Sequence, residues 1–265
     1  MTTSPTSYTE ETKQIAGADL KLLKAGSGDP LLVLHGELGH PGWLRCYEEL
    51  AKEYTVYIPL HPGFGVTSRL EWIMTMRDLS CWYLRAVEEL GLVAPNVLGF
   101  SMGGWLAAEM AAQQPSNIGK LALVSPPGIK PLEGEIMDMF LITSKEYFAA
   151  SILNPSETPG FSEMCPDELT PEHVDMWEDA REEACRLSWR PYMLDPALPH
   201  LLSLVKDLPT LLIWGEQDTV VPPSAGKAYQ QSISGSELVT IPNCGHRPEL
   251  EKPDEFVRLT KEFFK

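Results

Sequence analysis

The stretch that most constrains this sequence runs from residue 97 to residue 114. A short apolar run there enters the pentad Gly99-Phe100-Ser101-Met102-Gly103 and continues into strong helix formers. A serine on a sharp strand-to-helix turn needs glycines beside it, because the turn leaves no room for neighbouring β-carbons, and the turn lifts the hydroxyl clear of the sheet. The alternative is a Gly-Ser loop that merely fits the pattern. The stretch therefore predicts a strand, a turn carrying Ser101 as a nucleophile, and a helix.

Short apolar runs alternate with helical patterns along most of the chain. Runs that do not alternate polar and apolar residues indicate strands buried on both faces, and such strands occur in mostly parallel sheets covered by helices. We therefore predict an α/β fold. The predicted strands are residues 14–15, 20–23, 31–34, 54–58, 97–98, 121–124, 211–214 and 238–241, and the clearest predicted helices are 77–90 and 253–264.

Composition divides the chain into four segments. Residues 1–12 are polar and are expected to be disordered. Residues 129–205 change character, since prolines there punctuate short helical pieces rich in Met, Phe and Trp, and we interpret them as a helical insertion. Residues 13–128 and 206–265 then form the core domain.

Three residues stand just after predicted strands, where ligands collect in parallel sheets. They are Ser101, Asp218 and His246. A serine hydroxyl needs a base to take its proton, an imidazole is the usual base, and an acid must fix the imidazole tautomer. Alternatives remain at this stage. Glu216 could replace Asp218, and the rivals of His246 are His35, His40, His61, His173 and His200.

A second turn, His35-Gly36-Glu37-Leu38-Gly39, follows the strand predicted at residues 31–34. Backbone N–H groups aimed at a developing oxyanion stabilise it, and the expected donors are Met102 and Glu37, with Leu38 as the alternative to Glu37. A carboxylate at this site would be repulsive, so the Glu37 side chain should point away or meet a cation such as Arg45 or Arg190. Alternatively, Gly36 and Gly39 merely turn the chain.

Charge and cysteine usage exclude several functions. The chain has 21 Lys and Arg against 37 Asp and Glu, a net charge of −16, which disfavours nucleic acids and anionic membranes as partners. Its five scattered cysteines favour reduced thiols, and no run reaches membrane-spanning length. We expect a cytoplasmic monomer or homodimer, with no metal or cofactor and with a small-molecule ester or ketone as substrate.

Over about residues 20–264 the chain resembles the α/β-hydrolase fold superfamily, in the branch of serine esterases and meta-cleavage-product carbon-carbon hydrolases. The resemblance implies an eight-stranded, mostly parallel sheet with its second strand antiparallel, and a helical cap inserted after the sixth strand. The matching motifs are His35-Gly36, His61-Pro62-Gly63-Phe64-Gly65, Gly99-Phe100-Ser101-Met102-Gly103-Gly104, Trp214-Gly215-Glu216-Gln217-Asp218 and Gly245-His246.

Departures from the family patterns bear on the reaction. Haloalkane dehalogenases and epoxide hydrolases of this fold carry an aspartate nucleophile, so Ser101 argues against both. Carbon-carbon hydrolases usually have Asn before the serine and an aromatic residue after the histidine, where this chain has Phe100 and Arg247. We therefore predict a serine hydrolase that cleaves a small or medium apolar or aromatic ester through an acyl-enzyme, with a carbon-carbon hydrolase and a non-catalytic receptor as alternatives. The predicted substrate contacts are Phe100, Trp105, Met139, Phe140, Trp177, Trp189 and Arg190.

Overall fold

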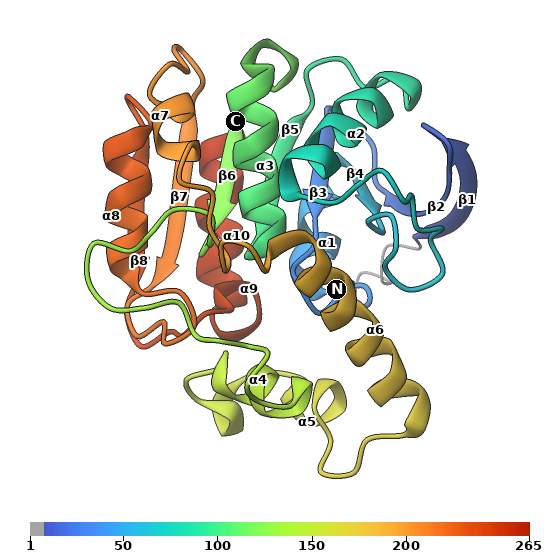
Figure 1. The fold of residues 1–265 in the computed structure, drawn as a ribbon, viewed down its shortest axis with the longest axis vertical. Helices are drawn as coiled ribbons and strands as arrows, with labels where there is room; N and C mark the ends of the chain where they lie inside the picture. The colour runs from blue at the N-terminus through green and yellow to red at the C-terminus, as the bar shows by residue number, and fades with distance from the viewer. Residues whose placement is uncertain (1–7) are drawn as a thin grey trace.

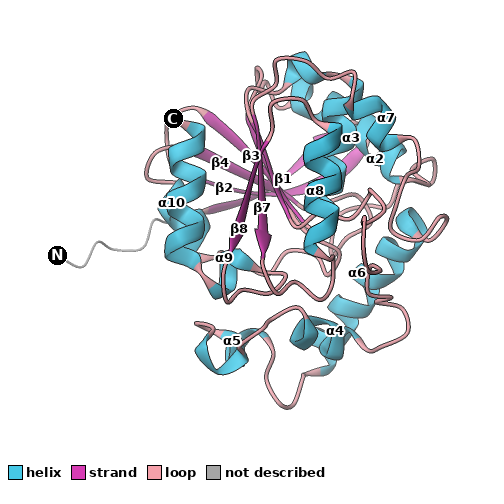
Figure 2. Cartoon of the chain, turned by 90° about the vertical axis from the view of Figure 1, so that its left-hand side faces the viewer, coloured by secondary structure: helices cyan, strands magenta, loops and turns pink. Residues whose placement is uncertain are grey.

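An eight-stranded sheet with helices on both faces organises the chain (Figures 1 and 2), in a computed structural model that describes residues 8–265. The strand order is β1-β2-β4-β3-β5-β6-β7-β8, and β2 runs antiparallel to both of its neighbours, while the pairs from β4 to β8 are parallel. The expected α/β-hydrolase architecture, with its antiparallel second strand, is confirmed.

The elements alternate much as the sequence predicts. The strands are β1 Thr9–Ile15, β2 Ala18–Ala25, β3 Pro30–Leu34, β4 Thr55–Pro59, β5 Asn96–Phe100, β6 Leu121–Val124, β7 Thr210–Gly215 and β8 Glu237–Ile241. The helices are α1 Arg45–Leu50, α2 Met76–Glu89, α3 Met102–Gln113, α4 Ser144–Ala150, α5 Phe161–Met164, α6 Pro171–Ser188, α7 Leu198–Leu202, α8 Pro223–Ser232, α9 Pro248–Glu251 and α10 Pro253–Phe264, with 3-10 turns η1 Pro115–Asn117 and η2 Pro155–Glu157.

Each face of the sheet has its own apolar core. Successive strand residues point to opposite faces, so Leu32 and Leu34 pack with α2, α3 and α8, while Leu31 and Val33 pack with α1 and α10. Figure 2 shows the sheet edge-on between these two helical layers. Because both faces are covered, the central strands are apolar throughout, which is why their sequences do not alternate.

The start of the chain corrects one expectation. Of the residues predicted to be disordered, 1–7 lie outside the described part of the chain, but Thr9–Ile15 form β1, which pairs antiparallel with β2 from Thr9↔Lys24 to Ile15↔Ala18. The disorder prediction is therefore wrong for residues 9–12. The error has a physical cause: β1 is an edge strand whose side chains are mostly exposed, so its sequence is polar like that of a disordered segment.

The segment between β6 and β7 lies mainly beyond the carboxyl ends of the strands. In Figure 1, α4, α5 and α6 lie below the arrowheads of the sheet. By contrast, α7 packs against α3 and α8 of the core. The insertion predicted over residues 129–205 thus includes a last helix that contacts the core, while α4 to α6 lie over the end of the sheet where chemistry is expected.

Candidate active site

Ser101 occupies a strained turn between β5 and α3. Its backbone has φ 47° and ψ −120°, values that a non-glycine residue seldom adopts. The glycines on either side are required by close approach: a β-carbon at Gly99 would lie 2.4 Å from the Gly103 carbonyl oxygen, and one at Gly103 would lie 2.3 Å from the Leu34 carbonyl oxygen. The G-x-S-x-G pattern is therefore a steric requirement of this turn.

The three residues predicted to act together meet at this turn. His246 Nε2 lies 2.9 Å from Ser101 Oγ, and His246 Nδ1 lies 2.8 Å from Asp218 Oδ2. Asp218 follows β7 and His246 follows β8, so the ends of three strands bring together residues up to 145 positions apart. All three are buried. This geometry allows the imidazole to accept the serine proton while the carboxylate fixes the ring.

The Asp218 carboxylate is itself held in place. Its Oδ1 accepts hydrogen bonds from the backbone N–H groups of Val220 and Val221, both at 2.9 Å, which leaves Oδ2 directed at His246. Burial lowers the pKa of His246, but the charge and hydrogen bond of Asp218 outweigh burial and raise that pKa above its ordinary 6.5. The alternative acid, Glu216, is exposed and accepts a hydrogen bond from Gln217.

Two of the rival histidines support the turn after β3. His35 and His61 stack with ring centroids 3.6 Å apart, and the His61 backbone N–H donates to His35 Nε2 at 3.0 Å. His61 Nδ1 lies 2.6 Å from the Tyr83 hydroxyl. Burial lowers the pKa of His35 to about 4 and lowers that of His61 as well, so both rings are neutral near pH 7. They link the His-Gly turn to the loop after β4.

The turn that carries Glu37 packs against the nucleophile. A β-carbon at Gly36 would lie 3.5 Å from Ser101 Cβ, and Gly36 and Gly39 close the turn through a 3.1 Å backbone hydrogen bond. Met102 is the first residue of α3, so its N–H belongs to the helix terminus, where backbone donors lack intrahelical acceptors. Met102 follows Ser101 directly, and Glu37 lies close enough to Ser101 for the serine hydroxyl to lower its pKa.

The Glu37 side chain meets a cation, but a different one from either candidate. Arg247 Nη2 donates to Glu37 Oε1 at 3.1 Å, and the carboxylate is completely buried. Burial raises the pKa of this carboxyl, but Arg247, His246 and the nearby Ser101 hydroxyl outweigh burial and hold the pKa at about 2. Arg45 pairs instead with Asp254, and Arg190 is exposed. The choice of Arg45 or Arg190 is therefore corrected to Arg247.

Arg247 also connects the site to the insertion. Its Nε donates to Ser151 Oγ at 2.8 Å, and its guanidinium lies 5.1 Å from the centre of the Phe148 ring. The Ser151 carbonyl in turn accepts the backbone N–H of His246 at 2.9 Å. Ser151 and the neighbouring Tyr147 are residues that the sequence analysis did not identify. The available signal was Arg247 itself, a charged residue directly beside the base.

The predicted substrate contacts are scattered. Phe100 shares its sheet face with Leu98, because alternate strand residues point the same way, and its ring packs against Tyr47 and Phe256 on the α1 and α10 side. Trp177 is buried in α6 and stacks on Phe148, with ring centroids 5.3 Å apart, so Phe148 contacts both Trp177 and Arg247. Met139 is buried as well, and its backbone N–H donates to Tyr192.

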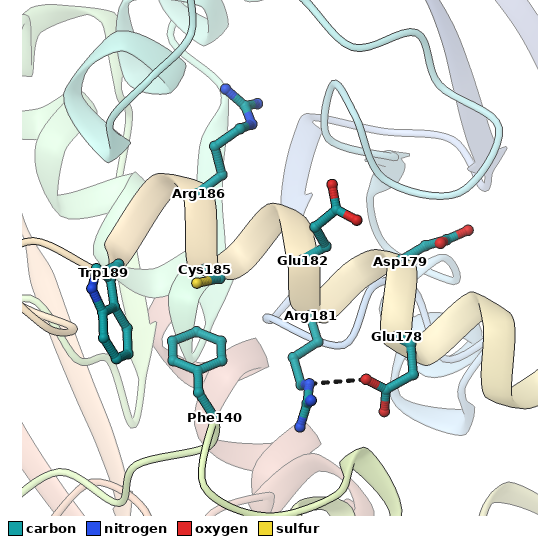
Figure 3. Close-up of a pocket in the computed structure, with 8 residues that line it drawn as sticks. All are labelled: Phe140, Glu178, Asp179, Arg181, Glu182, Cys185, Arg186 and Trp189. Atoms are coloured by element: carbon teal, nitrogen blue, oxygen red, sulfur yellow. Dashed lines mark ion pairs between the residues drawn. The ribbon is translucent and has the colours of Figure 1, made fainter.

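Two cavities hold the remaining predicted contacts. A groove of about 700 Å³ along α6 is lined by Phe140 and Trp189, whose ring centroids are 5.5 Å apart, together with Cys185 and several charged residues (Figure 3). Trp189 is 52% exposed there. A second cavity of about 250 Å³ contains Trp105 and Arg190. Neither cavity has Ser101, Asp218 or His246 in its lining.

Within residues 8–265, no group of three or more His, Cys, Asp or Glu side chains is arranged to hold a metal ion. No helix in that same range is both long enough and apolar enough to cross a membrane.

Known proteins resemble the chain over most of its length. A family model described as "Alpha/beta hydrolase family" matches residues 31–259. The chain is 26% identical to 2-hydroxy-6-oxo-6-phenylhexa-2,4-dienoate hydrolase of Comamonas testosteroni, over 91% of this chain and 90% of that protein. It is 27% identical to monoacylglycerol lipase abhd6-B of Xenopus laevis, over 91% of this chain and 76% of that one. The solved structure of 2-hydroxy-6-oxo-6-phenylhexa-2,4-dienoate hydrolase from Rhodococcus sp. strain RHA1 superposes with a TM-score of 0.77 at 21% identity, covering 98% of this chain and 99% of that one.

Proposed function

The chain belongs to the alpha/beta hydrolase family, and within it we propose a serine hydrolase that cleaves a small or medium apolar or aromatic carboxylic ester through an acyl-enzyme. The observation that carries the proposal is the hydrogen-bonded series Ser101, His246 and Asp218, with contacts of 2.9 and 2.8 Å. A buried hydroxyl, base and acid in this order match what nucleophilic catalysis requires.

The proposed reaction has two steps. His246 removes the proton of Ser101 as Oγ attacks the ester carbonyl, and the N–H groups of Met102 and Glu37 stabilise the oxyanion. His246 then protonates the departing alcohol. In the second step, His246 activates a water molecule that hydrolyses the acyl-enzyme and frees Ser101, while Asp218 stabilises the imidazolium in both steps.

A carbon-carbon hydrolase is the second candidate, favoured by the similarity to the Comamonas dienoate hydrolase. It would use the same three residues, with a ketonised carbon as the leaving group. The ester proposal is preferred because Arg247 stands after the histidine, where an aromatic residue is usual in carbon-carbon hydrolases.

A labelling experiment tests the nucleophile. A fluorophosphonate should label the wild-type protein at Ser101, whereas Ser101→Ala should not react and should lose about three to six orders of magnitude in ester turnover. Ser80→Ala is a matched control, because it also removes a buried serine hydroxyl, but from α2. Labelling that persists in Ser101→Ala would refute the assignment, and an unreactive wild type would favour a non-catalytic receptor.

A substrate panel tests the reaction. We expect p-nitrophenyl esters to be cleaved with a dependence on acyl chain, and a vinylogous 1,5-diketone not to be cleaved. Turnover of the diketone without ester cleavage would instead support the carbon-carbon hydrolase.

A further inference from the structure

One oxygen of the buried Glu37 carboxylate accepts no hydrogen bond from the described residues. Its Oε1 accepts the hydrogen bond from Arg247 at 3.1 Å, whereas Oε2 has no hydrogen-bond partner among residues 8–265. Glu37 is completely buried and lies close enough to Ser101 for the serine hydroxyl to lower its pKa. An unpartnered anionic oxygen therefore lies next to the proposed nucleophile, where the reacting part of a substrate must come.

The neighbouring hydroxyls do not satisfy this oxygen. Ser101 has a single hydroxyl proton, and when that proton is directed to His246 Nε2 at 2.9 Å it cannot also serve Glu37. The Tyr147 hydroxyl also lies beside the carboxylate, whose charge and weak hydrogen bond raise the pKa of the tyrosine further than burial alone, but this contact does not give Oε2 a well-formed hydrogen bond. One acceptor thus remains available in a buried polar cluster.

Burial makes an unsatisfied acceptor costly. A carboxylate oxygen that loses contact with solvent without gaining a donor carries the full desolvation penalty, which is largest for charged groups. Glu37 is already excluded from solvent in the free protein, so its Oε2 carries this penalty before any substrate binds. A purely apolar ester leaves Oε2 unsatisfied, whereas an ester with a hydroxyl near its carbonyl supplies the missing donor.

Charge balance favours a neutral donor. The Arg247 guanidinium neutralises Glu37, so the pair carries no net charge, and a substrate ammonium approaching Oε2 would also be repelled by Arg247. A hydroxyl has no such disadvantage.

We propose that Glu37 is a specificity-determining residue whose Oε2 accepts a hydrogen bond from a substrate hydroxyl close to the scissile carbonyl, so that hydroxy esters are the preferred substrate class. The hydroxyl can belong to the acyl part or to the alcohol part. The inference rests on the proposed function, because it assumes that the scissile carbonyl is held at Ser101.

Paired esters test the preference on both sides of the carbonyl. In the acyl arm, ethyl 2-hydroxy-2-phenylacetate is compared with its 2-methoxy analogue, and in the alcohol arm 2-hydroxyethyl phenylacetate is compared with 2-methoxyethyl phenylacetate. In one arm the wild type should favour the hydroxyl compound in kcat/KM by roughly 10- to 100-fold, the range expected for a hydrogen bond to a charged acceptor.

Two variants separate substrate recognition from support of the fold. Glu37→Met/Arg247→Met removes the pair while keeping the site neutral, and the hydroxyl-to-methoxy ratio should fall to about 1. A purely structural pair would slow both esters equally and leave the ratio unchanged, which would overturn the inference. Tyr147→Phe should keep the preference, and loss of the preference in that variant alone would assign the role to Tyr147 instead.

Plain ester cleavage keeps the two proposals distinguishable. If ethyl phenylacetate is hydrolysed and Ser101 is labelled, but neither arm shows a hydroxyl preference, then the inference fails and the proposed function stands. If no ester is hydrolysed and Ser101 is not labelled, both fail.

Discussion

Replacing Arg247 by methionine removes the cation paired with Glu37 and leaves a buried carboxylate alone beside Ser101. The two side chains are almost completely buried, so the attraction between them is only weakly screened by solvent. A fall in the Glu37 pKa from 4.5 to about 2 corresponds to about 3 kcal/mol of favourable interaction with the ionised form. Breaking a buried pair from one side costs about 3–5 kcal/mol. We therefore expect Arg247→Met to lower the free energy of unfolding by that amount at pH 7.

The effect should depend on pH in a definite direction. In the wild type the folded pKa of Glu37 is below the unfolded value, so the stabilisation is complete above about pH 4.5 and is lost as the pH falls toward 2. In Arg247→Met, burial loses its largest compensation and the folded pKa rises, so the carboxylate destabilises the protein at pH 7 and does so much less once it is protonated. The difference in stability between wild type and variant should shrink between pH 7 and pH 4.

Urea unfolding followed by circular dichroism at pH 7, 5.5 and 4 measures the difference in unfolding free energy between wild type and variant. In a thermal melt at pH 7, the melting temperature of the variant should be lower by roughly 6–10 °C. The control is Glu37→Met/Arg247→Met, which keeps the site neutral and leaves Glu249, another buried carboxyl near Arg247, in the same setting as in the single variant. The double variant should be more stable than Arg247→Met at pH 7. Equal stability of wild type and Arg247→Met, or a double variant no better than the single one, would refute the reasoning.

Two further predictions concern the catalytic series. Asp218→Asn should reduce kcat by about three to four orders of magnitude while the protein stays folded, because an amide cannot stabilise the imidazolium. Assays at pH 7 with p-nitrophenyl butyrate measure kcat, and a loss below tenfold would contradict the role of Asp218 as the acid. In the wild type, kcat/KM should fall on the acid side with an apparent pKa above 6.5, because His246 must be neutral to accept a proton and Asp218 raises its pKa. A pH-rate profile whose acid limb lies well below pH 6 would contradict the assignment of His246 as the base.

The parts of the site that could be predicted are those fixed by backbone topology. Ser101, Asp218 and His246 each follow a strand, and parallel strands bring such positions to one edge of the sheet whatever the surrounding side chains. The glycines around Ser101 were informative for the same reason, since a β-carbon at Gly99 or Gly103 would collide with backbone atoms rather than with adaptable side chains.

Side-chain direction was harder to predict. Phe100 is next to the nucleophile in sequence, but strand alternation turns its ring to the opposite core, toward Tyr47 and Phe256. Trp189 and Phe140 are aromatic residues of the insertion, and they line an outer groove along α6 (Figure 3). Aromatic composition predicted that the insertion would have apolar surfaces, but the choice of surface depends on how α6 is rotated on the core, which composition does not encode.

The Glu37–Arg247 pair illustrates the remaining gap most sharply. Its members are 210 residues apart, and each looks unfavourable in its own local context: a carboxylate in the proposed oxyanion turn and a cation beside the proposed base. Each becomes intelligible through the other, because a buried carboxylate at residue 37 needs a cation and a buried guanidinium at residue 247 needs an anion. The departure at position 247 from the aromatic residue usual in carbon-carbon hydrolases is therefore tied to the residue at position 37. Two residues that look unfavourable on their own, at the ends of different strands, are therefore better treated as one candidate interaction.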